Sequence, residues 1–217
     1  MLTYDLYWSF RSPYSYFVAR RLRVLEEEFE VRCNVRPIFP IAVRTPEFFE
    51  GRDPLWFSYF MTDIRREAEF LGLPMRWPRP DPVFRLPDGS YPKEQPHIHR
   101  LTYLGVAAAE RGRGLPFLDE VSSLIWSGAV DDWHLGDHLR GAAGRAGLDF
   151  DELIAAVDGD PDRYRAIVEE SQVAQRAAGH YGVPMMVFNG EPFFGQDRYD
   201  QFRWRLEQQG LRRRAAA

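Results

Sequence analysis

The sequence predicts an α/β protein whose sheet is interrupted by a large, all-helical insertion. The chain begins with a strand–helix–strand pattern and ends with a strand–strand–helix pattern, and the block between them reads as helices. Neither end has enough strands for a stable sheet by itself, so we expect the two ends to pair. The expected units are residues 1–45 together with 180–217, and a helical unit over residues 46–179.

In the first 38 residues, apolar side chains recur with two different spacings, one typical of strands and one typical of a helix. Apolar side chains alternate with polar ones over residues 2–8 and again over 31–38, which indicates half-buried strands. Between them, Ser12 followed by Pro13 is a helix-start signal, and apolar residues then recur at helical spacing as far as Phe29. A β-α-β start normally places its two strands in parallel.

The middle of the chain reads as a series of helices joined by loops rich in proline and glycine. Gly112, Gly128 and Gly147 lie at or just past the ends of three of them, as helix C-caps often do. The periodicity predicts helices over residues 53–71, 96–111, 116–127, 132–146, 150–157 and 163–179.

The strand pattern returns near the end. Apolar stretches at residues 185–188 and 192–194 flank Asn189-Gly190, which is a strong signal for a two-residue hairpin. A helix is expected over 197–209, followed by a frayed tail over 211–217. A β-α-β start and a β-β-α finish separated by helices predict a thioredoxin-like sheet with an inserted helical domain.

The amino-acid composition argues against several classes of function. The 217-residue chain is 45% hydrophobic with a net charge of −4, so we expect no nucleic-acid partner, because such proteins usually carry a basic surface. No apolar run approaches 18 residues and the N-terminus does not resemble a signal peptide, so we expect no membrane association. With a single cysteine, Cys33, there is no intramolecular disulfide and no redox pair. We expect a buried Cys33 thiol and a cytoplasmic, reducing environment.

Ser12-Pro13-Tyr14-Ser15 stands where the first strand gives way to a helix. Unpaired N–H groups and the helix dipole favour an anion there. In redox proteins of this fold the same position holds Cys-x-x-Cys, but here serine occupies both sulfur positions, which excludes disulfide exchange at this site. Ser12 can donate a hydrogen bond to the thiolate of another molecule, or it can simply cap the helix.

Two further stretches each have a functional and a structural interpretation. Val183-Pro184 enters a strand, where proline is unusual. A cis bond there would free the Val183 backbone to pair with an extended ligand, whereas a trans bond would make Pro184 an ordinary strand-start proline. Gln196 and Asp197 follow a glycine at the start of the last helix, where Asp197 either holds an ammonium group or caps the helix.

Together these stretches resemble the 2-hydroxychromene-2-carboxylate isomerase and kappa-class glutathione transferase family, within the wider DsbA-like clan. The resemblance includes the segment from Tyr59 to Pro74. It implies that Ser12 contacts the sulfur of glutathione, or of a similar small thiol, at the start of the helix with Pro13 and Tyr14. It further implies that Val183, before Pro184, pairs through its backbone with the cysteinyl part. Gln196 and Asp197 would hold the γ-glutamyl end.

The family also implies a reaction. We expect a thiol-dependent isomerase, in which the thiolate adds to an aromatic or conjugated carbonyl substrate, and a homodimer. The alternatives are a transferase resembling the kappa class and a non-catalytic thioredoxin-fold binding module. The chain departs from the family after the second strand, where Arg44 would replace the usual lysine or asparagine in contacting the thiol's glycine carboxylate. It departs again at residues 95–100, in the insertion that shapes the second-substrate pocket.

The histidines give weaker signals. His134 and His138 are spaced like metal ligands on the expected helix 132–146, but a zinc protease would carry glutamate where Leu135 stands. We therefore expect no metal. His97 and His99 either line the pocket of the second substrate or are exposed.

Overall fold

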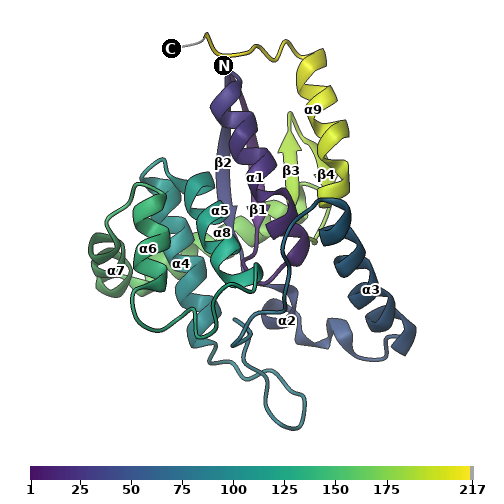
Figure 1. The fold of residues 1–217 in the computed structure, drawn as a ribbon, viewed down its shortest axis with the longest axis vertical. Helices are drawn as coiled ribbons and strands as arrows, with labels where there is room; N and C mark the ends of the chain where they lie inside the picture. Colours follow the sequence, from purple (N-terminus) through teal and green to yellow (C-terminus); the bar gives the residue numbers. More distant parts are fainter. Residues whose placement is uncertain (216–217) are drawn as a thin grey trace.

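Residues 1–215 are described by a computed structural model, in which a small sheet is flanked by helices (Figure 1). Its strands are β1 (Leu2–Trp8), β2 (Val31–Pro37), β3 (Met185–Phe188) and β4 (Glu191–Phe194). Its helices are α1 (Pro13–Glu28), α2 (Ile41–Arg44), η1 (Pro46–Phe49), α3 (Pro54–Phe70), α4 (Pro96–Glu110), α5 (Gly114–Trp126), α6 (His138–Arg145), α7 (Phe150–Gly159), α8 (Pro161–Ala177), η2 (Gln196–Arg198) and α9 (Tyr199–Gln208).

The two ends of the chain form one sheet, in the order β2-β1-β3-β4. β1 and β2 pair in parallel, with Leu2 opposite Val31, whereas β1 pairs antiparallel with β3, with Leu6 opposite Met186. β3 and β4 form the hairpin predicted at Asn189-Gly190, both of whose residues have the positive φ that such a turn requires. The predicted thioredoxin-like sheet with a helical insertion is confirmed.

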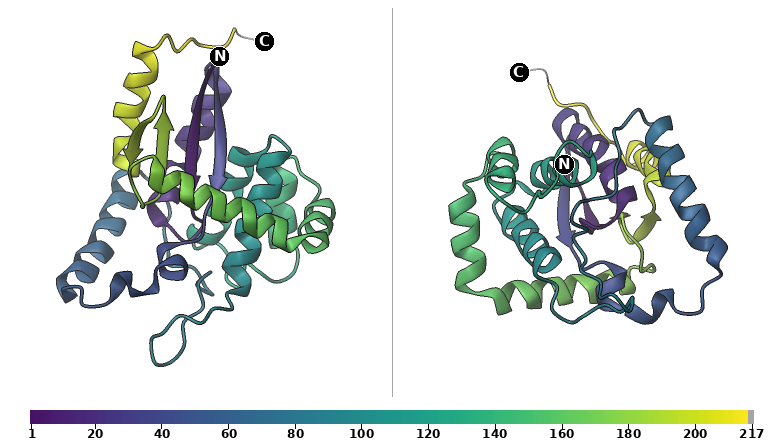
Figure 2. Two further views of the ribbon diagram at one scale, coloured as in Figure 1. Left: turned by 180° about the vertical axis from the view of Figure 1, so that it is seen from behind. Right: turned by 60° about the horizontal axis from the view of Figure 1, so that its bottom comes forward.

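Helices cover both faces of the sheet. Tyr4, Leu6 and Trp8 of β1 pack into the core that contains α1 and α9. Tyr7 points to the other face, where it packs with Met185 and Val187 close to α8, which Figure 2 shows crossing the back of the sheet. The sequence pattern predicted a half-buried β1, but Tyr7 is also buried, because α8 returns from the insertion to cover this face.

α4 and α5 of the insertion pack beside β2 and continue the same core. α5 lies against α1, and the indole N–H of Trp126 at the end of α5 donates a hydrogen bond to the Phe10 carbonyl at 2.8 Å. α4 packs against β2 and α5, whereas α6 and α7 lie outside α4 and α5, and α3 stands on the other side of the molecule (Figure 1). No helix within residues 1–215 is both long and apolar enough to cross a membrane.

Two expected elements differ from the structure. The helix expected over 132–146 begins only at His138, because Asp132 and Gly136 have positive φ values and Trp133 turns inward to bond the Pro80 carbonyl. The tail was expected to fray from residue 211, but the backbone of residues 212–214 bonds to that of Glu28 and Glu30. Residues 216–217 of that tail lie outside the described residues.

Candidate functional site

Ser12 joins the start of α1 to the loop that precedes β3. Its hydroxyl oxygen accepts a hydrogen bond from the Ser15 N–H at 3.2 Å, as an N-cap does. The same hydroxyl donates to the Val183 carbonyl at 3.3 Å, across 171 positions of sequence. The fold therefore brings together two of the stretches that the sequence indicated separately.

At the N-terminus of α1, one backbone N–H group remains without an acceptor in the described chain. Pro13 has no N–H, Ser12 engages the N–H of Ser15, and the Tyr14 N–H has no acceptor among residues 1–215. Ser12 is half-buried, so an incoming anion can approach both its hydroxyl and this N–H. Ser15 lies one turn further in and is fully buried, with no hydrogen-bond partner for its hydroxyl in the described chain.

The loop before β3 is held on several sides. The Val183-Pro184 bond is cis, one of the two arrangements that the sequence left open. The buried Gln175 side chain of α8 donates to the Gly182 carbonyl at 2.7 Å, and the Pro184 carbonyl accepts from the Gly195 N–H at 2.9 Å. In contrast, the Val183 N–H donates to no group within the described residues. A ligand strand can use this N–H together with the Val183 carbonyl.

Arg44 lies at the base of this loop. Its guanidinium donates to the Gln175 side chain at 3.0 Å and to the Tyr181 carbonyl at 2.5 Å. Burial, reinforced by the charge of Arg176, lowers the pKa of Arg44 to about 10, which still leaves it positively charged at neutral pH. The contact of Arg44 with the thiol carboxylate remains a prediction. In the structure, the Arg44 side chain also supports the loop through its bonds to Gln175 and Tyr181.

The turn after β4 contributes Gln196 and Asp197, which have different environments. The Gln196 side chain is buried, where it accepts from Arg21 and donates to Glu67 at 2.6 Å. The Gln196 amide is therefore hydrogen-bonded within the protein, and these bonds hold the turn in place. The Asp197 side chain is 59% exposed and pairs with Arg198 at 3.1 Å, without capping the backbone of either η2 or α9. Asp197 is therefore the side chain of this turn that is free to bind a ligand.

Tyr14 connects the site to α3. Its hydroxyl donates to Asp63 at 2.6 Å, and Asp63 also accepts from Arg66 at 2.5 Å. Burial, followed by the hydrogen bond to Asp63, raises the pKa of the Tyr14 phenol, so it remains protonated as a donor. The Tyr14 ring packs edge-on against Phe60. An aromatic wall therefore begins directly beside the helix terminus.

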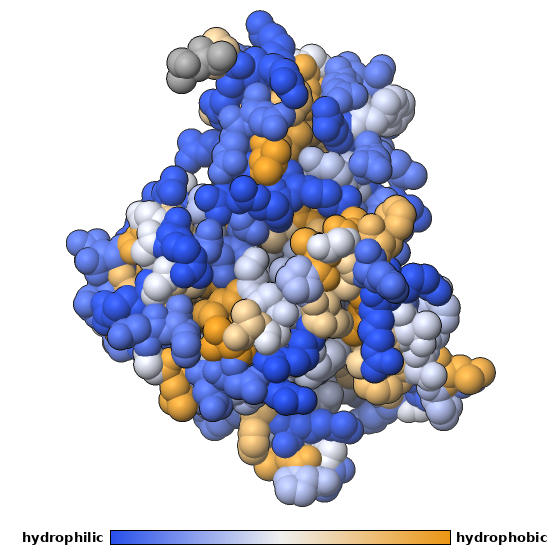
Figure 3. Space-filling view, viewed as in Figure 1, coloured by the Kyte–Doolittle hydropathy of each residue, from blue (hydrophilic) through white to orange (hydrophobic). Residues whose placement is uncertain are grey.

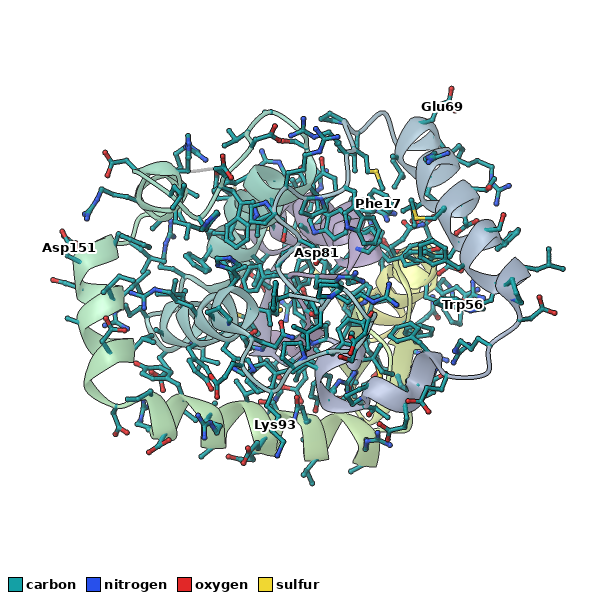
Figure 4. The ribbon with its side chains drawn as sticks, turned by 90° about the horizontal axis from the view of Figure 1, so that it is seen from below. Phe17, Trp56, Glu69, Asp81, Lys93 and Asp151 are labelled. Atoms are coloured by element: carbon teal, nitrogen blue, oxygen red, sulfur yellow. The ribbon has the colours of Figure 1, made fainter. Side chains whose placement is uncertain are left out.

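A salt bridge that the sequence did not indicate borders the other side of Ser12. Arg11 binds Asp81 through two hydrogen bonds of 3.1 and 2.8 Å, and its guanidinium lies 4.7 Å from the centre of the Trp77 ring. The Trp77 indole also donates to Asp81, at 3.0 Å. Asp81, near the centre of Figure 4, thus anchors the loop between α3 and α4 to the residue before Ser12. The only sequence signal was the position of Arg11 next to the serine.

The sequence of residues 3–207 matches the family model of the DSBA-like thioredoxin domain. The chain belongs to this family. No curated protein matches it significantly in sequence.

Several proteins of known structure share this fold at low sequence identity. A 2-hydroxychromene-2-carboxylate isomerase is 18% identical, with a TM-score of 0.69 over 96% of both chains. A probable DsbA oxidoreductase from Streptomyces coelicolor is 19% identical, with a TM-score of 0.65 over 100% of this chain and 94% of the other. The cytosolic disulfide reductase DsbM from Pseudomonas aeruginosa is 18% identical, with a TM-score of 0.60 over 96% and 98%. These similarities show that the chain has the DsbA-like fold.

This DsbA-like chain does not place its cysteine at the helix terminus. Cys33 lies on β2, an edge strand of the sheet, beside a groove of about 280 Å³ formed with α4, α5 and α8. Burial raises the pKa of its thiol well above the ordinary value, so the unreactive thiol form dominates.

The histidines are arranged differently from the expectation. His134 lies in the turn before α6 and His138 is the first residue of α6, so they do not share a helix. His97 instead packs against His134, with ring centres 4.4 Å apart, and His99 packs against Phe39. Within residues 1–215, no group of three or more His, Cys, Asp or Glu side chains is arranged to hold a metal.

Proposed function

We propose that the protein is an isomerase that uses glutathione or a similar small thiol, with Ser12 stabilising the thiolate. The observation that carries this proposal is the hydrogen bond between the Ser12 hydroxyl and the Val183 carbonyl. This contact joins the Ser12 hydroxyl, which we propose as the donor to the thiolate, to the Val183 backbone, which we propose as the partner of the cysteinyl part of the same ligand. In support, DsbM from Pseudomonas aeruginosa, one of the structural relatives, is also known with GSH.

Binding would exchange the existing hydrogen bonds for equivalent ones. The Ser12 proton turns from the Val183 carbonyl to the thiolate, and an amide N–H of the ligand replaces it on that carbonyl. The free Val183 N–H binds a ligand carbonyl, and the free Tyr14 N–H and the α1 dipole add to the field at the sulfur. Asp197 binds the ammonium group, while Gln196 and Arg44 keep the two flanking loops in place.

The reaction would return the thiol unchanged. The thiolate sulfur forms a bond to the electrophilic carbon of a conjugated carbonyl substrate, and the displaced electron pair moves to the carbonyl oxygen. The former double bond is now single and rotates. The electron pair then returns and expels the thiolate, which leaves an isomer with no net oxidation. Tyr14, Phe60 and Trp77 support an aromatic substrate, because they form a connected set of rings beside Ser12.

A pH titration of the bound thiol in Ser12→Ala and Ser15→Ala variants tests the proposal, because thiolate absorbs in the ultraviolet and thiol does not. We expect Ser12→Ala to raise the pKa of the bound thiol, to cost about 1 kcal/mol of stability as a lost cap, and to slow addition to conjugated carbonyls. Ser15→Ala is the matched control, since its hydroxyl forms no hydrogen bond in the described chain. Equal pKa values of the bound thiol in wild type and Ser12→Ala would reduce Ser12 to a helix cap.

The products of the assay separate the alternatives. A rearranged substrate with the thiol released indicates the isomerase, and a stable thioether indicates a transferase like the kappa class. Tight thiol binding without turnover of any conjugated carbonyl indicates a binding module.

We also propose that the protein is a homodimer, on the basis of α3. Only Ile64 and Ala68 of this 17-residue helix are buried, whereas Leu55, Phe57 and Phe70 are 58–82% exposed. Apolar surface is visible over α3 in Figure 3. We expect light scattering to give twice the chain mass for wild type and the single mass for Phe57→Glu, with the exposed Val173→Glu of α8 as the control. A monomeric wild type would contradict the proposal.

A further inference from the structure

The loop that joins α8 to β3 contains His180, whose imidazole takes no part in the proposed contacts to the thiol. The ring is half-buried and stacks on the rings of Phe194 and Tyr181, with ring centres 3.9 and 4.7 Å apart. Its Nδ1 accepts a hydrogen bond from the Gly182 N–H at 2.9 Å. The stacking therefore fixes the imidazole with Nδ1 directed at the backbone of the residue that precedes Val183.

Gly182 is held from both sides by side chains. His180 accepts from its N–H, and the buried Gln175 of α8 donates to its carbonyl at 2.7 Å. Phe194 bounds Gly182 on a third side, where a β-carbon would lie 2.2 Å from the ring. Val183 follows directly in the chain, so the position of its backbone depends on these contacts to Gly182.

The bond to His180 is the contact of this loop that depends on a proton near neutral pH. Gln175 does not titrate, and Arg44, which donates to the Tyr181 carbonyl, has a pKa of about 10 and stays charged. Burial lowers the pKa of His180, which forms no salt bridge with any described residue. Charged groups on the elements around the loop include Arg176 of α8 and the pairs Glu191–Arg205 and Asp197–Arg198.

Protonation of His180 removes its bond to Gly182. A neutral imidazole has one N–H and one acceptor nitrogen, so Nδ1 accepts from Gly182 only when the proton is on Nε2. The imidazolium ion has an N–H at both nitrogens, and its Nδ1–H would face the Gly182 N–H as donor against donor. Of these two bonds, Gly182 would keep only the one to Gln175. The bond to His180 is therefore present above the pKa of His180 and is lost as the pH falls through it.

We propose that His180 is a positioning residue of the thiol site. It holds Gly182, and with it the Val183 backbone, in the arrangement that binds the cysteinyl part of the ligand, and it does so only while its Nδ1 is unprotonated. This inference rests on the proposed function of the Ser12 site. Its consequence is that binding weakens as the pH falls through the pKa of His180.

The first experiment follows the thiol-free protein by NMR. We expect the Gly182 amide signal and the ring Cε1–H signal of His180 to titrate with the same midpoint, because one proton controls both. His180→Asn is the matched variant, since its Oδ1 is placed like Nδ1, can accept from the N–H two residues ahead and does not titrate. In this variant the Gly182 signal should lose that midpoint. A Gly182 signal that does not follow His180 in wild type would overturn the proposal.

The second experiment measures binding of S-methylglutathione, a probe with no thiol to ionise, by calorimetry one pH unit above and one below that midpoint. Relative to His180→Asn, we expect wild type to lose roughly threefold in affinity at the lower pH, as the loss of about one hydrogen bond predicts. At the higher pH, His180→Asn should bind as wild type does. His180→Phe keeps the stacking but has no acceptor, so it should bind roughly fivefold more weakly than His180→Asn at both pH values.

The outcomes separate this inference from the proposed function. An equal loss of affinity in wild type and His180→Asn at the lower pH would overturn the positioning role alone, because another group would then titrate. Full affinity of His180→Phe at the higher pH would overturn it as well. If none of the three proteins bound the probe at either pH, the proposed thiol site would be wrong, and the positioning role with it. Wild type and His180→Asn decide the question even if His180→Phe does not fold.

Discussion

The two serines at the start of α1 are three positions apart and have different surroundings. The Ser12 hydroxyl is half-buried and connects the helix terminus to Val183, whereas the Ser15 hydroxyl is buried without a partner among residues 1–215. Only Ser12 is placed to donate to a ligand. The pair thus offers a test of the thiolate contact within a single turn of helix.

Asp197 is predicted to hold the ammonium end of the thiol ligand. Its carboxylate is exposed and its pair with Arg198 is a weak surface salt bridge. We expect Asp197→Asn to weaken thiol binding roughly tenfold, or about 1.4 kcal/mol, because a charge-assisted hydrogen bond is lost. Calorimetric titration measures this loss. The melting temperature without thiol should remain unchanged.

Asp200→Asn is the matched control for Asp197, because this exposed carboxylate lies in the first turn of α9. It should bind the thiol as wild type does. Equal affinities for the two variants would show that Asp197 does not contact the ligand.

Among the elements, the loop before β3 requires glycine at position 182. A β-carbon there would lie 2.2 Å from the Phe194 ring of β4, which is stacked on His180 with ring centres 3.9 Å apart. The loop can therefore approach β4 only because position 182 has no side chain. This approach also sets where Val183 presents its backbone to a ligand.

We expect Gly182→Ala to weaken thiol binding about tenfold, because the loop must move away from Phe194 and shift Val183. The double variant Gly182→Ala/Phe194→Ala should recover most of the affinity shown by Phe194→Ala alone, since the clash is gone. Titration of all four proteins forms a double-mutant cycle. Additive losses would mean that Phe194 is not the obstacle.

Across the whole molecule, three histidines link stability to pH. Burial lowers the pKa values of His97, His99 and His180. The folded protein then binds fewer protons than the unfolded chain at pH values below about 6.5, so stability is complete above that pH and falls as pH decreases. In the folded protein Nδ1 of His180 also accepts a hydrogen bond from the Gly182 N–H at 2.9 Å, a contact that only an unprotonated nitrogen can make.

We expect the melting temperature to decrease from pH 7.5 to pH 5.5, by roughly 2–4 °C for each kcal/mol of stability lost. Replacing His97, His99 and His180 with glutamine should reduce this dependence, because glutamine does not titrate. His138→Gln, at an exposed position, should leave the dependence as in wild type. A wild-type melting temperature that is equal at both pH values would refute the linkage.

Much of the architecture could be predicted, because the positions of strands and helices follow the spacing of apolar residues along the chain. The strands at residues 2–8 and 185–188, the hairpin at Asn189-Gly190 and most helix limits agree with the structure within about two residues. The exception is the helix expected over 132–146. The pattern there continues through residues 132–137, but Trp133 forms a tertiary hydrogen bond to Pro80 and α6 starts later.

By itself, the sequence determined the order of strands and helices and the replacement of both redox cysteines by Ser12 and Ser15. These features depend on a few neighbouring residues, whose periodicity and backbone preferences are readable along the chain. Only the tertiary structure decided that Ser12 meets Val183, that Arg11 binds Asp81, and that Gln175 supports the loop at Gly182. Each of the first two contacts joins residues 70 or more positions apart, and Gln175 is buried on a helix whose pattern resembles a polar surface. Such contacts depend on how whole elements pack, because a hydrogen bond forms only where packing brings donor and acceptor within reach.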